Sequence, residues 1–367
     1  MPHGAAGFWC WRPVAVLIST AMPTDGLYGI RATRASPPGY ARDDRARRAV
    51  YGSALAQFDE LIAAATAVGP ASRPLPLFYA LSQAGRAIAA AHAEGVWRLR
   101  MHGLSAPGLD RAPLGIEVNR MPSAAKDGSS VDSVSGVAAA TGSEVFTGAA
   151  TIGALWSSLP ELFHLLPASC HGMPTPLRLV PENPEPENLH VRIDPGHLYA
   201  TVVGFDGTAD ELATYLKNHY PSSGNPQLFQ PQGLPHVGQH TACGYGYLFR
   251  WEADAPTIEG HLATLNRLAP PEGPKVSTGG AGLIFPPSAG FQPRWLRPSI
   301  GGAGISSLVS WWTLLFGLSM LARYEPAVWV GVLDYDSAGL AAPLAALLET
   351  GLARVPELVL AALATQA

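Results

Sequence analysis

The sequence has few charged residues and few cysteines. Only 14% of its 367 residues are Asp, Glu, Lys or Arg, whereas about a quarter is usual in soluble proteins. The three cysteines, Cys10, Cys170 and Cys243, lie far apart and form no CxxC pair, which argues against a disulfide framework and against a zinc site. Free thiols are typical of a reducing compartment, so we expect a cytoplasmic protein.

No apolar segment is long enough to cross a bilayer. The most apolar stretch, Leu308 to Ala322, has about 15 residues, and roughly 20 are needed. A buried core helix is the better interpretation of this stretch. The apolar run from Phe8 to Ala21 lacks a basic leader and is interrupted by Arg12 and Pro13, which argues against a secretory signal. The sequence therefore predicts no membrane partner.

The charges that are present indicate no nucleic-acid surface. The formal net charge of −4 argues against nucleic-acid binding over the whole surface. Basic residues cluster locally at Arg42, Arg45, Arg47 and Arg48, which indicates a solvated first turn of a helix, with a phosphate-binding patch as the alternative. Hydrophobic residues make up 47% of the chain, enough for one large domain or several smaller ones.

Helical patterns lie near both ends of the chain. In the first of them, Val50, Phe58 and Leu61 share one face, and Gly69-Pro70 ends the pattern. In the helix expected at 306–323, Ser306 or Ser307 is the expected cap. The helices expected near the two ends are 43–68, 74–93, 306–323, 337–348 and 355–364.

The middle of the chain contains more strand-like patterns. Valine alternates with small polar residues in Val131–Val137, which predicts a short strand, and Tyr245–Trp251 predicts another. A strand pair is expected over Leu189–Val203, and Thr208 with Glu211 has a capping-box pattern ahead of a helix. Further expectations are a strand at Val14–Ser19 and a connector at 167–188.

Together these patterns predict an α+β fold. A helical core is expected from the N- and C-terminal helices, with a central β-rich, mostly antiparallel insert. The expected parts are an N-terminal helical part at 1–95, a β-rich middle part at 96–304, and a C-terminal helical part at 305–367 that packs on the N-terminal helices.

Polar residues in the helix 74–93 form one group. Tyr79, Gln83 and Arg86 follow helical spacing, and Ser82 lies four residues before Arg86. The rest of this helix is almost entirely apolar. Its arginine is therefore expected either at the solvent edge or buried with acceptors, because burying an unpaired guanidinium costs several kcal/mol.

The C-terminal helix repeats this pattern. Leu81-Ser82-x-x-x-Arg86 matches Leu318-Ser319-x-x-x-Arg323, so we expect the two helices to pack together and to place both arginines near one polar pocket. Coincidence in a sequence rich in Ala and Leu is the alternative. Candidate acceptors are Glu325, Asp334 and Asp336, or a bound anion. The predicted ligand-binding residues are Tyr79, Ser82, Gln83, Arg86, His102, Ser319 and Arg323, and no cofactor fingerprint or metal site is predicted.

Several segments resemble the YaaC-like family of bacterial proteins. The residues that carry the resemblance are Ser72-Arg73-Pro74, the run Leu77 to Ile88, His102-Gly103-Leu104, Leu155-Trp156, Leu159 to Leu162, and Leu318 to Pro326 with Trp329. They occur in order over nearly the whole chain. The resemblance implies no particular reaction, so function is inferred from the polar residues themselves.

A second resemblance is to HEPN-type helical domains. Nuclease members of that group carry an arginine followed after a few residues by histidine, as Arg86 and His92 are here, and this resemblance implies RNA cleavage in a dimer cleft. The polar residue expected directly after the arginine is absent, because residue 87 is alanine. The first hypothesis is therefore a non-catalytic binding or regulatory protein for an anionic ligand or protein partner. The alternative is a HEPN-like ribonuclease or RNA-binding protein. Under both hypotheses the protein could form a homodimer.

Overall fold

The computed structural model confirms the α+β class. It describes residues 24–166, 172–181, 194, 196–221, 224, 226–229, 239–241, 244–270, 294–336 and 339–364, so the strand expected at Val14–Ser19 lies outside the described residues. The helices are α1 (Thr24–Ala35), α2 (Arg45–Ala67), α3 (Pro74–His92), α4 (Ser133–Thr141), α5 (Ile152–Ser157), α6 (Ala209–His219), α7 (Ile258–Leu268), α8 (Ser307–Tyr324), α9 (Pro326–Val332) and α10 (Ala341–Ala364). The strands are β1 (Leu104–Ser105), β2 (Glu117–Arg120), β3 (Ala150–Thr151), β4 (Leu177–Pro181), β5 (His197–Val203), β6 (Gln227–Leu228), β7 (Gln239–Thr241), β8 (Gly244–Glu252) and β9 (Arg294–Leu296).

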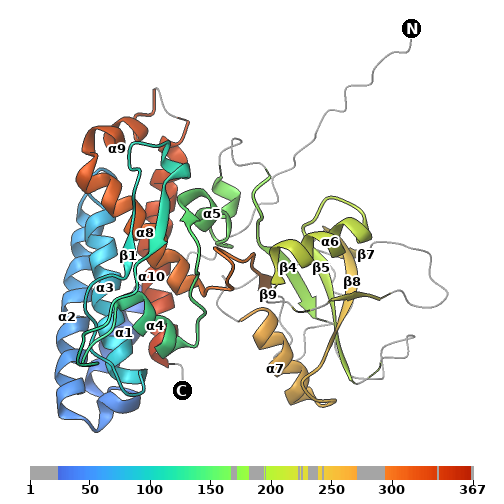
Figure 1. Ribbon diagram of the computed structural model, residues 1–367, viewed down its shortest axis with the longest axis horizontal. Helices are drawn as coiled ribbons and strands as arrows, with labels where there is room; N and C mark the ends of the chain where they lie inside the picture. Colours follow the sequence, from blue (N-terminus) through green and yellow to red (C-terminus); the bar gives the residue numbers. More distant parts are fainter. Residues whose placement is uncertain are drawn as a thin grey trace.

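A helical body contains both ends of the described chain. α2 and α3 lie side by side, α8 and α10 pack against α3, and α1 packs against α10 (Figure 1). The helix expected at 74–93 is α3, and its apolar sequence is explained by its central position. Gly85 allows close packing on α8, because a Cβ at this position would lie only 2.4 Å from the ring of Trp312. A small antiparallel sheet, β1-β2-β3, covers part of this body.

A second body is built around an antiparallel sheet. Its strand order is β6-β8-β5-β4-β9, and β7 also pairs with β8. Alternate residues of β5 point into a core that α6 and α7 share, with Leu198 and Val202 from the strand and Leu212 and Leu265 from the helices. The strand predicted at Tyr245–Trp251 is confirmed as part of β8.

Several predicted elements are wrong. The segment Val131–Val137 is not a strand, because Asp132 caps the helix α4 and turns the alternating valines onto a helical face. The two helices expected at the C-terminus are one helix, α10, which continues through Pro356. The supposed connector 167–188 contains β4, and Val50 is exposed rather than on the buried face of α2. The capping box of Thr208 and Glu211 is confirmed at the start of α6.

The two hydrophobic cores divide the described chain differently from the expected parts. The helical core takes residues from 30–166 and 300–363, and the core of the second body takes residues from 177–296. Residues 97–166, expected in the β-rich middle, therefore belong with the helices, because buried side chains such as Ile152 and Trp156 join the same core as α8. The boundaries at 96 and 305 remain a prediction.

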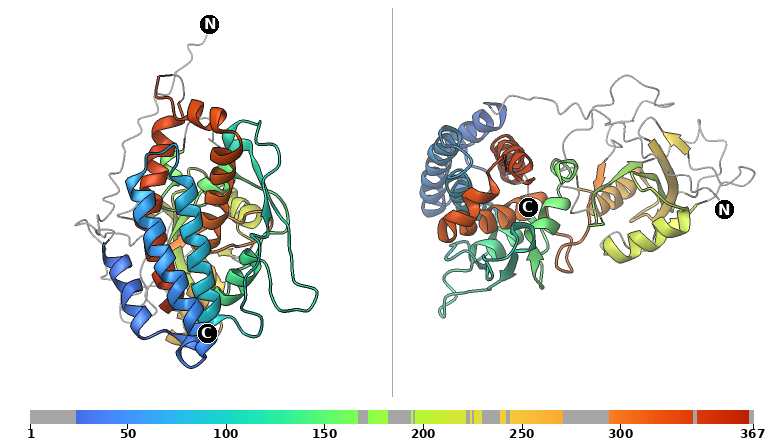
Figure 2. Two further views of the ribbon diagram at one scale, coloured as in Figure 1. Left: turned by 90° about the vertical axis from the view of Figure 1, so that its left-hand side faces the viewer. Right: turned by 90° about the horizontal axis from the view of Figure 1, so that it is seen from above.

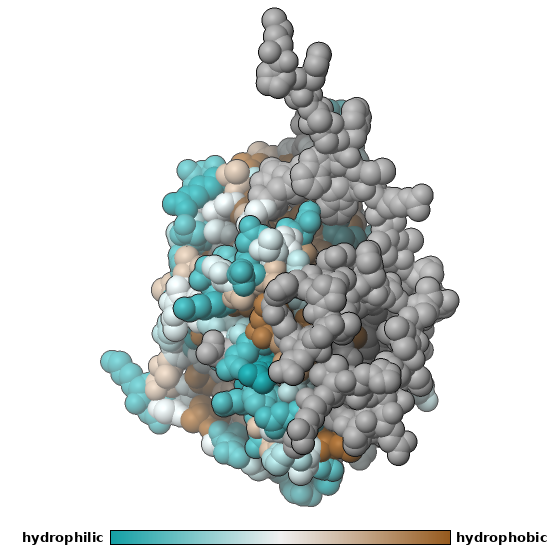
Figure 3. All heavy atoms as spheres, turned by 90° about the vertical axis from the view of Figure 1, so that its right-hand side faces the viewer, coloured by the Kyte–Doolittle hydropathy of each residue, from teal (hydrophilic) through white to brown (hydrophobic). Residues whose placement is uncertain are grey.

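The chain passes between the bodies close to Arg297. Its guanidinium donates hydrogen bonds to the carbonyl oxygens of Ser158 and Ile305 at 3.1 and 2.9 Å, and to Ser310 Oγ at 2.6 Å. Figure 2 shows the helical body and the sheet body side by side when seen from above. On the face of the sheet body drawn in Figure 3, the described residues mix hydrophilic and hydrophobic side chains. In the described ranges, no helix combines the length and the hydropathy that crossing a membrane requires.

Candidate functional site: a pocket between α3 and α8

A pocket of about 200 Å³ lies between α3, α8 and the turn that precedes β1. We call it the α3–α8 pocket. Its polar lining residues are Tyr79 from α3, His102 from the turn, and Ser319 and Arg323 from α8. Its aromatic walls are Phe78, Phe316 and Tyr324. The pocket therefore combines aromatic and aliphatic walls with polar groups in about equal share.

The ring of His102 lies against the aromatic walls. Its centroid is 5.1 Å from that of Phe78 and 5.8 Å from that of Phe316. Burial, followed by the positive charges of Arg86 and Arg323, lowers the pKa of His102 below its ordinary 6.5. The imidazole is therefore predominantly neutral near pH 7, and both arginines lie close enough to act on it electrostatically.

Both arginines lie at the solvent edge, which is one of the two environments expected from the sequence. Arg323 Nη1 is 3.4 Å from Tyr79 Oη, and its guanidinium lies 5.1 Å from the ring centroid of Tyr324. Arg86 Nη1 donates to the carbonyl oxygen of Leu99 at 3.1 Å.

Neither arginine has a carboxylate partner. Among the described residues, no Asp or Glu oxygen lies within 4.0 Å of either guanidinium, so the candidate acceptors Glu325, Asp334 and Asp336 do not neutralise them. Both guanidinium groups are therefore exposed and unpaired with a carboxylate in the described part of the chain.

The structure brings four of the seven predicted ligand-binding residues into one pocket, and the other three lie outside its lining. Ser82 is buried one turn further along α3, on the face that carries Tyr79 and Arg86, and its Oγ has no hydrogen-bond partner. Gln83 is half-buried and does not line the pocket. Ser319 Oγ donates to the carbonyl oxygen of Phe316 at 2.8 Å. Its hydroxyl oxygen can therefore act toward a ligand only as an acceptor.

His92 does not share this site. Its side chain is buried, and its Nε2 lies 3.0 Å from the carbonyl oxygen of Leu363 on α10. Arg86 and His92 are six residues apart and project from different sides of α3. An RNase of the HEPN type needs this histidine exposed in a cleft beside the arginine. Here His92 is only 5% exposed and lies at the edge of a different hollow, whose lining does not include Arg86.

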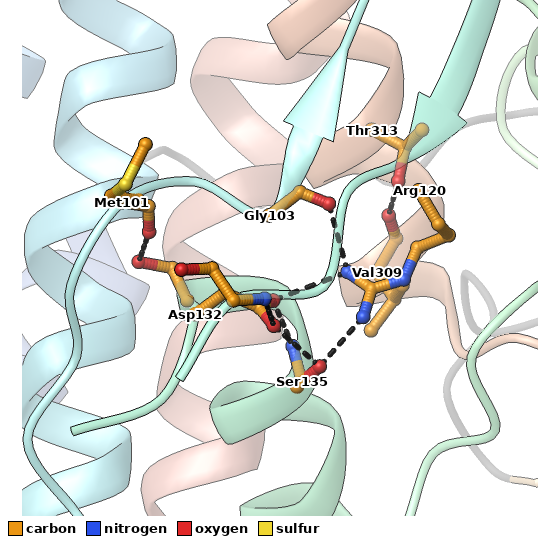
Figure 4. Close-up of polar contacts among 9 residues, drawn as sticks. Met101, Gly103, Arg120, Asp132, Ser135, Val309 and Thr313 are labelled. Carbon is orange, nitrogen blue, oxygen red and sulfur yellow. Dashed lines mark hydrogen bonds and ion pairs between the residues drawn. The ribbon is translucent and has the colours of Figure 1, made fainter. Parts of the chain in front are cut away.

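Sequence reasoning missed a buried polar network behind the pocket (Figure 4). Asp132 is 1% exposed, and its carboxylate accepts hydrogen bonds from Arg120 Nη1 at 3.2 Å and from Ser135 Oγ at 2.8 Å. Burial opposes the charge of this carboxylate, but hydrogen bonds from the backbone and side chain of Ser135 are strong enough to lower the pKa of Asp132. An aspartate directly before a run of apolar residues is a helix-cap signal, and the alternating valines concealed it.

A larger hollow, about 830 Å³, lies between the end of α3, the loop 124–131 and α4. Its lining consists mostly of Ala, Gly and Ser, and it contains no Arg or Lys. It therefore lacks the cations that an anion requires. Within the described part of the chain, no three His, Cys, Asp or Glu side chains are grouped in a way that could hold a metal ion.

Comparison with protein families gives a match over residues 38–363 to the family described as YaaC-like Protein. Neither the curated proteins nor the solved structures gave a match. The matched range contains α3, α8 and the turn at His102, and therefore every residue of the α3–α8 pocket. Because the match covers most of the polypeptide, the chain belongs to the YaaC-like family.

Proposed function

We propose that this protein is a non-catalytic binding protein that holds a small anionic ligand in the α3–α8 pocket. One observation carries the proposal: Arg86 and Arg323, on two different helices, both act on the half-buried His102, and neither forms an ion pair with a carboxylate of the described residues. Guanidinium groups are the preferred partners of carboxylates and phosphates in proteins. An anion would therefore supply the missing negative charge.

The volume of the pocket limits the ligand. At about 200 Å³ it is smaller than the 300–1,000 Å³ typical of sites for drug-sized molecules. A phosphate, a sulfate or a short organic acid fits this size. The aromatic walls Phe78, Phe316 and Tyr324 suit a small apolar portion attached to the anionic group.

The polar groups of the pocket favour binding over catalysis. A nucleophilic serine needs a base within hydrogen-bond reach. Ser319 instead donates to the carbonyl oxygen of its own helix at Phe316, and His102 packs against aromatic rings. The ribonuclease alternative has less support, because His92 is buried and bonded to α10. A protein partner, a homodimer and a cytoplasmic location remain predictions.

The proposal is tested by measuring the binding of sulfate and of inorganic phosphate to the full chain by calorimetry. Arg323 lines the pocket, so Arg323→Gln removes a charge-assisted contact and should weaken binding by about tenfold or more. Arg86 lies outside the lining and acts only through its charge, so Arg86→Gln should weaken binding less. The matched control is Arg34→Gln, because Arg34 is likewise an exposed arginine in the last turn of a helix, α1.

The control variant should bind as the wild type does. If the wild type binds neither anion, or if all three variants bind equally well, the α3–α8 pocket is not an anion site. A thermal unfolding curve for each variant shows whether a lost affinity reflects a lost fold.

A further inference from the structure

The turn that carries His102 is held by a buried network on its far side. We propose that Arg120, Asp132 and Ser135 are positioning residues of the α3–α8 pocket: they fix the turn Met101–Gly103 and thereby the place of the His102 ring. The effect of this network on ligand binding rests on the proposed function. The structural part, the dependence of His102 on the network, stands by itself and is tested separately.

All three carbonyl oxygens of the turn are bound by neighbouring groups. Ser133 donates two hydrogen bonds to the carbonyl oxygen of Met101, one from Oγ at 2.7 Å and one from its backbone N–H at 3.1 Å. The backbone N–H of Val134 donates to the carbonyl oxygen of His102 at 3.3 Å. Arg120 Nη1 donates to Gly103 at 3.0 Å and to the Asp132 carboxylate at 3.2 Å. The start of α4 and the arginine of β2 therefore act on the turn together.

The carboxylate of Asp132 lies tightly against the turn. A Cβ at Gly103 would be 2.0 Å from Asp132 Oδ1, so this close approach requires glycine. Asp132 also accepts hydrogen bonds from the backbone N–H of Ser135 at 2.9 Å and of Ser123 at 3.2 Å. Figure 4 shows these groups converging from the turn, β2 and α4. One side chain thus joins three segments that are separate in the sequence.

The turn has an uncommon backbone that needs such support. Met101 has φ = 59° and Gly103 has φ = 76°, on either side of His102. A non-glycine residue in the left-handed region persists only where surrounding contacts determine it. If these contacts were loosened, the turn would relax, and the His102 ring would move away from Phe78 and Phe316. The histidine would then become more hydrated and would lie further from the two arginines.

A role in positioning also explains why the ion pair is buried. A buried pair of this kind is weak evidence for stability, because removing both charges from water offsets much of their attraction. The side chains of Arg120 and Asp132 are only 8% and 1% exposed. Arg120 binds the turn directly through the carbonyl oxygen of Gly103, and Asp132 holds Arg120 and the start of α4 in place. These hydrogen bonds are more informative than the charge of the pair, because they define a single conformation next to the pocket.

The experiment follows the imidazole resonances of His102 by NMR in the full, ligand-free chain, with His102→Gln used to identify them. Asp132→Asn and the milder Ser135→Ala are compared with the wild type. Both variants should move the His102 titration midpoint upward, toward 6.5, because hydration increases and the arginines recede. The milder variant keeps the Arg120–Asp132 pair and guards against loss of the fold.

The matched control is Glu161→Gln. Glu161 is also a buried carboxylate, which accepts from Trp311 Nε1 at 2.7 Å and pairs with Arg354 at 3.5 Å, without contact to the turn. Glu161→Gln should leave the titration midpoint of His102 unchanged, even if the substitution lowers the melting temperature. Calorimetry with sulfate should show about tenfold weaker binding for Asp132→Asn and wild-type binding for the control.

The two proposals fail in different ways. If Asp132→Asn and Ser135→Ala both fold and leave the His102 midpoint at its wild-type value, the positioning inference is overturned, whatever sulfate does. If the midpoint moves in these variants but the wild type binds neither sulfate nor phosphate, the network positions His102 and the proposed function is wrong.

Discussion

Several arginines of this protein bind carbonyl oxygens at helix ends. Arg47 is buried, and its Nη1 donates to the carbonyl oxygens of Ala93 at 2.8 Å and Ala90 at 3.4 Å, at the end of α3. Its guanidinium also lies 4.7 Å from the ring centroid of Tyr40. The sequence indicated a solvated cluster around this arginine. The structure shows that one of its members caps the C-terminal end of α3, which lies more than forty residues later in the chain.

Replacing Arg47 should therefore destabilise the protein. A charge-assisted hydrogen bond to a buried carbonyl is worth about 1.5–3 kcal/mol. Arg47→Gln removes one of normal length, to Ala93, and a weaker one of 3.4 Å, to Ala90, so we expect a loss of at least about 2 kcal/mol in the free energy of unfolding. Urea unfolding measures this change. Arg45→Gln is the control, because Arg45 is exposed in the same first turn of α2 and should change stability by at most about 0.5 kcal/mol. Equal effects of the two substitutions would show that the contacts of Arg47 carry no special stability.

The pocket residues were partly accessible to sequence reasoning. Tyr79, Ser319 and Arg323 follow from helical spacing and from the repeated Ser-x-x-x-Arg pattern, because i, i+4 and i+7 positions of a helix necessarily share a face. Arg120 and Asp132 were not found. They are twelve residues apart and meet only through a turn whose positive φ angles carry no strong sequence signal.

At the scale of elements, the site depends on how closely α3 and α8 approach. Phe78 of α3 contacts Phe316 of α8 with ring centroids 5.5 Å apart, and Trp312 packs over Gly85. The absence of a side chain at Gly85 sets this approach. The two helices then present Tyr79 and Arg323 to the same pocket.

A methyl group at Gly85 should force the two helices apart. We expect Gly85→Ala to destabilise the fold by about 1–3 kcal/mol, because the new Cβ would lie 2.4 Å from the Trp312 ring. The control is Gly52→Ala in α2, which meets no atom within 4 Å and should stabilise the helix by roughly 0.5–1 kcal/mol. Thermal and urea unfolding measure both. A stabilising Gly85→Ala would contradict the packing described here.

Helix α10 shows why element boundaries escaped prediction. The sequence predicted two helices, 337–348 and 355–364, with a break between them, whereas α10 runs without a break to Ala364 and contains Pro356. Proline inside a helix removes one hydrogen bond. In the structure α1 packs on α10 there, and a Cβ at Gly26 would lie 3.3 Å from Pro356. This contact between distant parts of the chain supports a continuous helix. Local patterns contain no information about such tertiary support.

At the scale of the whole molecule, the charge distribution matches a site for a small anion better than one for nucleic acid. The net charge is −4, so the surface as a whole repels a polyanion. The positive field is local, at Arg86 and Arg323 beside the α3–α8 pocket. A small ligand needs only this local field, whereas RNA needs an extended positive surface.

The α+β class and the packing of terminal helices follow from composition and periodicity alone. The division of the chain into two hydrophobic cores does not follow from composition and periodicity. Residues 97–166 have few long periodic segments, so their sequence resembles the sheet body, yet their apolar side chains complete the helical core. Which core a short, irregular segment joins is decided by tertiary contacts.

An anion held between α3 and α8 should change the titration of His102. Its charged neighbours are Arg86 on α3 and Arg323 on α8, and both, together with burial, lower the pKa of His102 in the free protein. A bound anion offsets their field and raises that pKa, so binding takes up a proton. Affinity should then increase as the pH falls from the raised pKa of the complex toward the lower pKa of the free protein.

The measurement is an NMR titration of the His102 imidazole with and without saturating sulfate, which keeps its charge near neutral pH. The account predicts a midpoint below 6.5 in the free protein and a clear upward shift with sulfate, absent in Arg323→Gln. An identical midpoint with and without sulfate would contradict a shared anion site between α3 and α8.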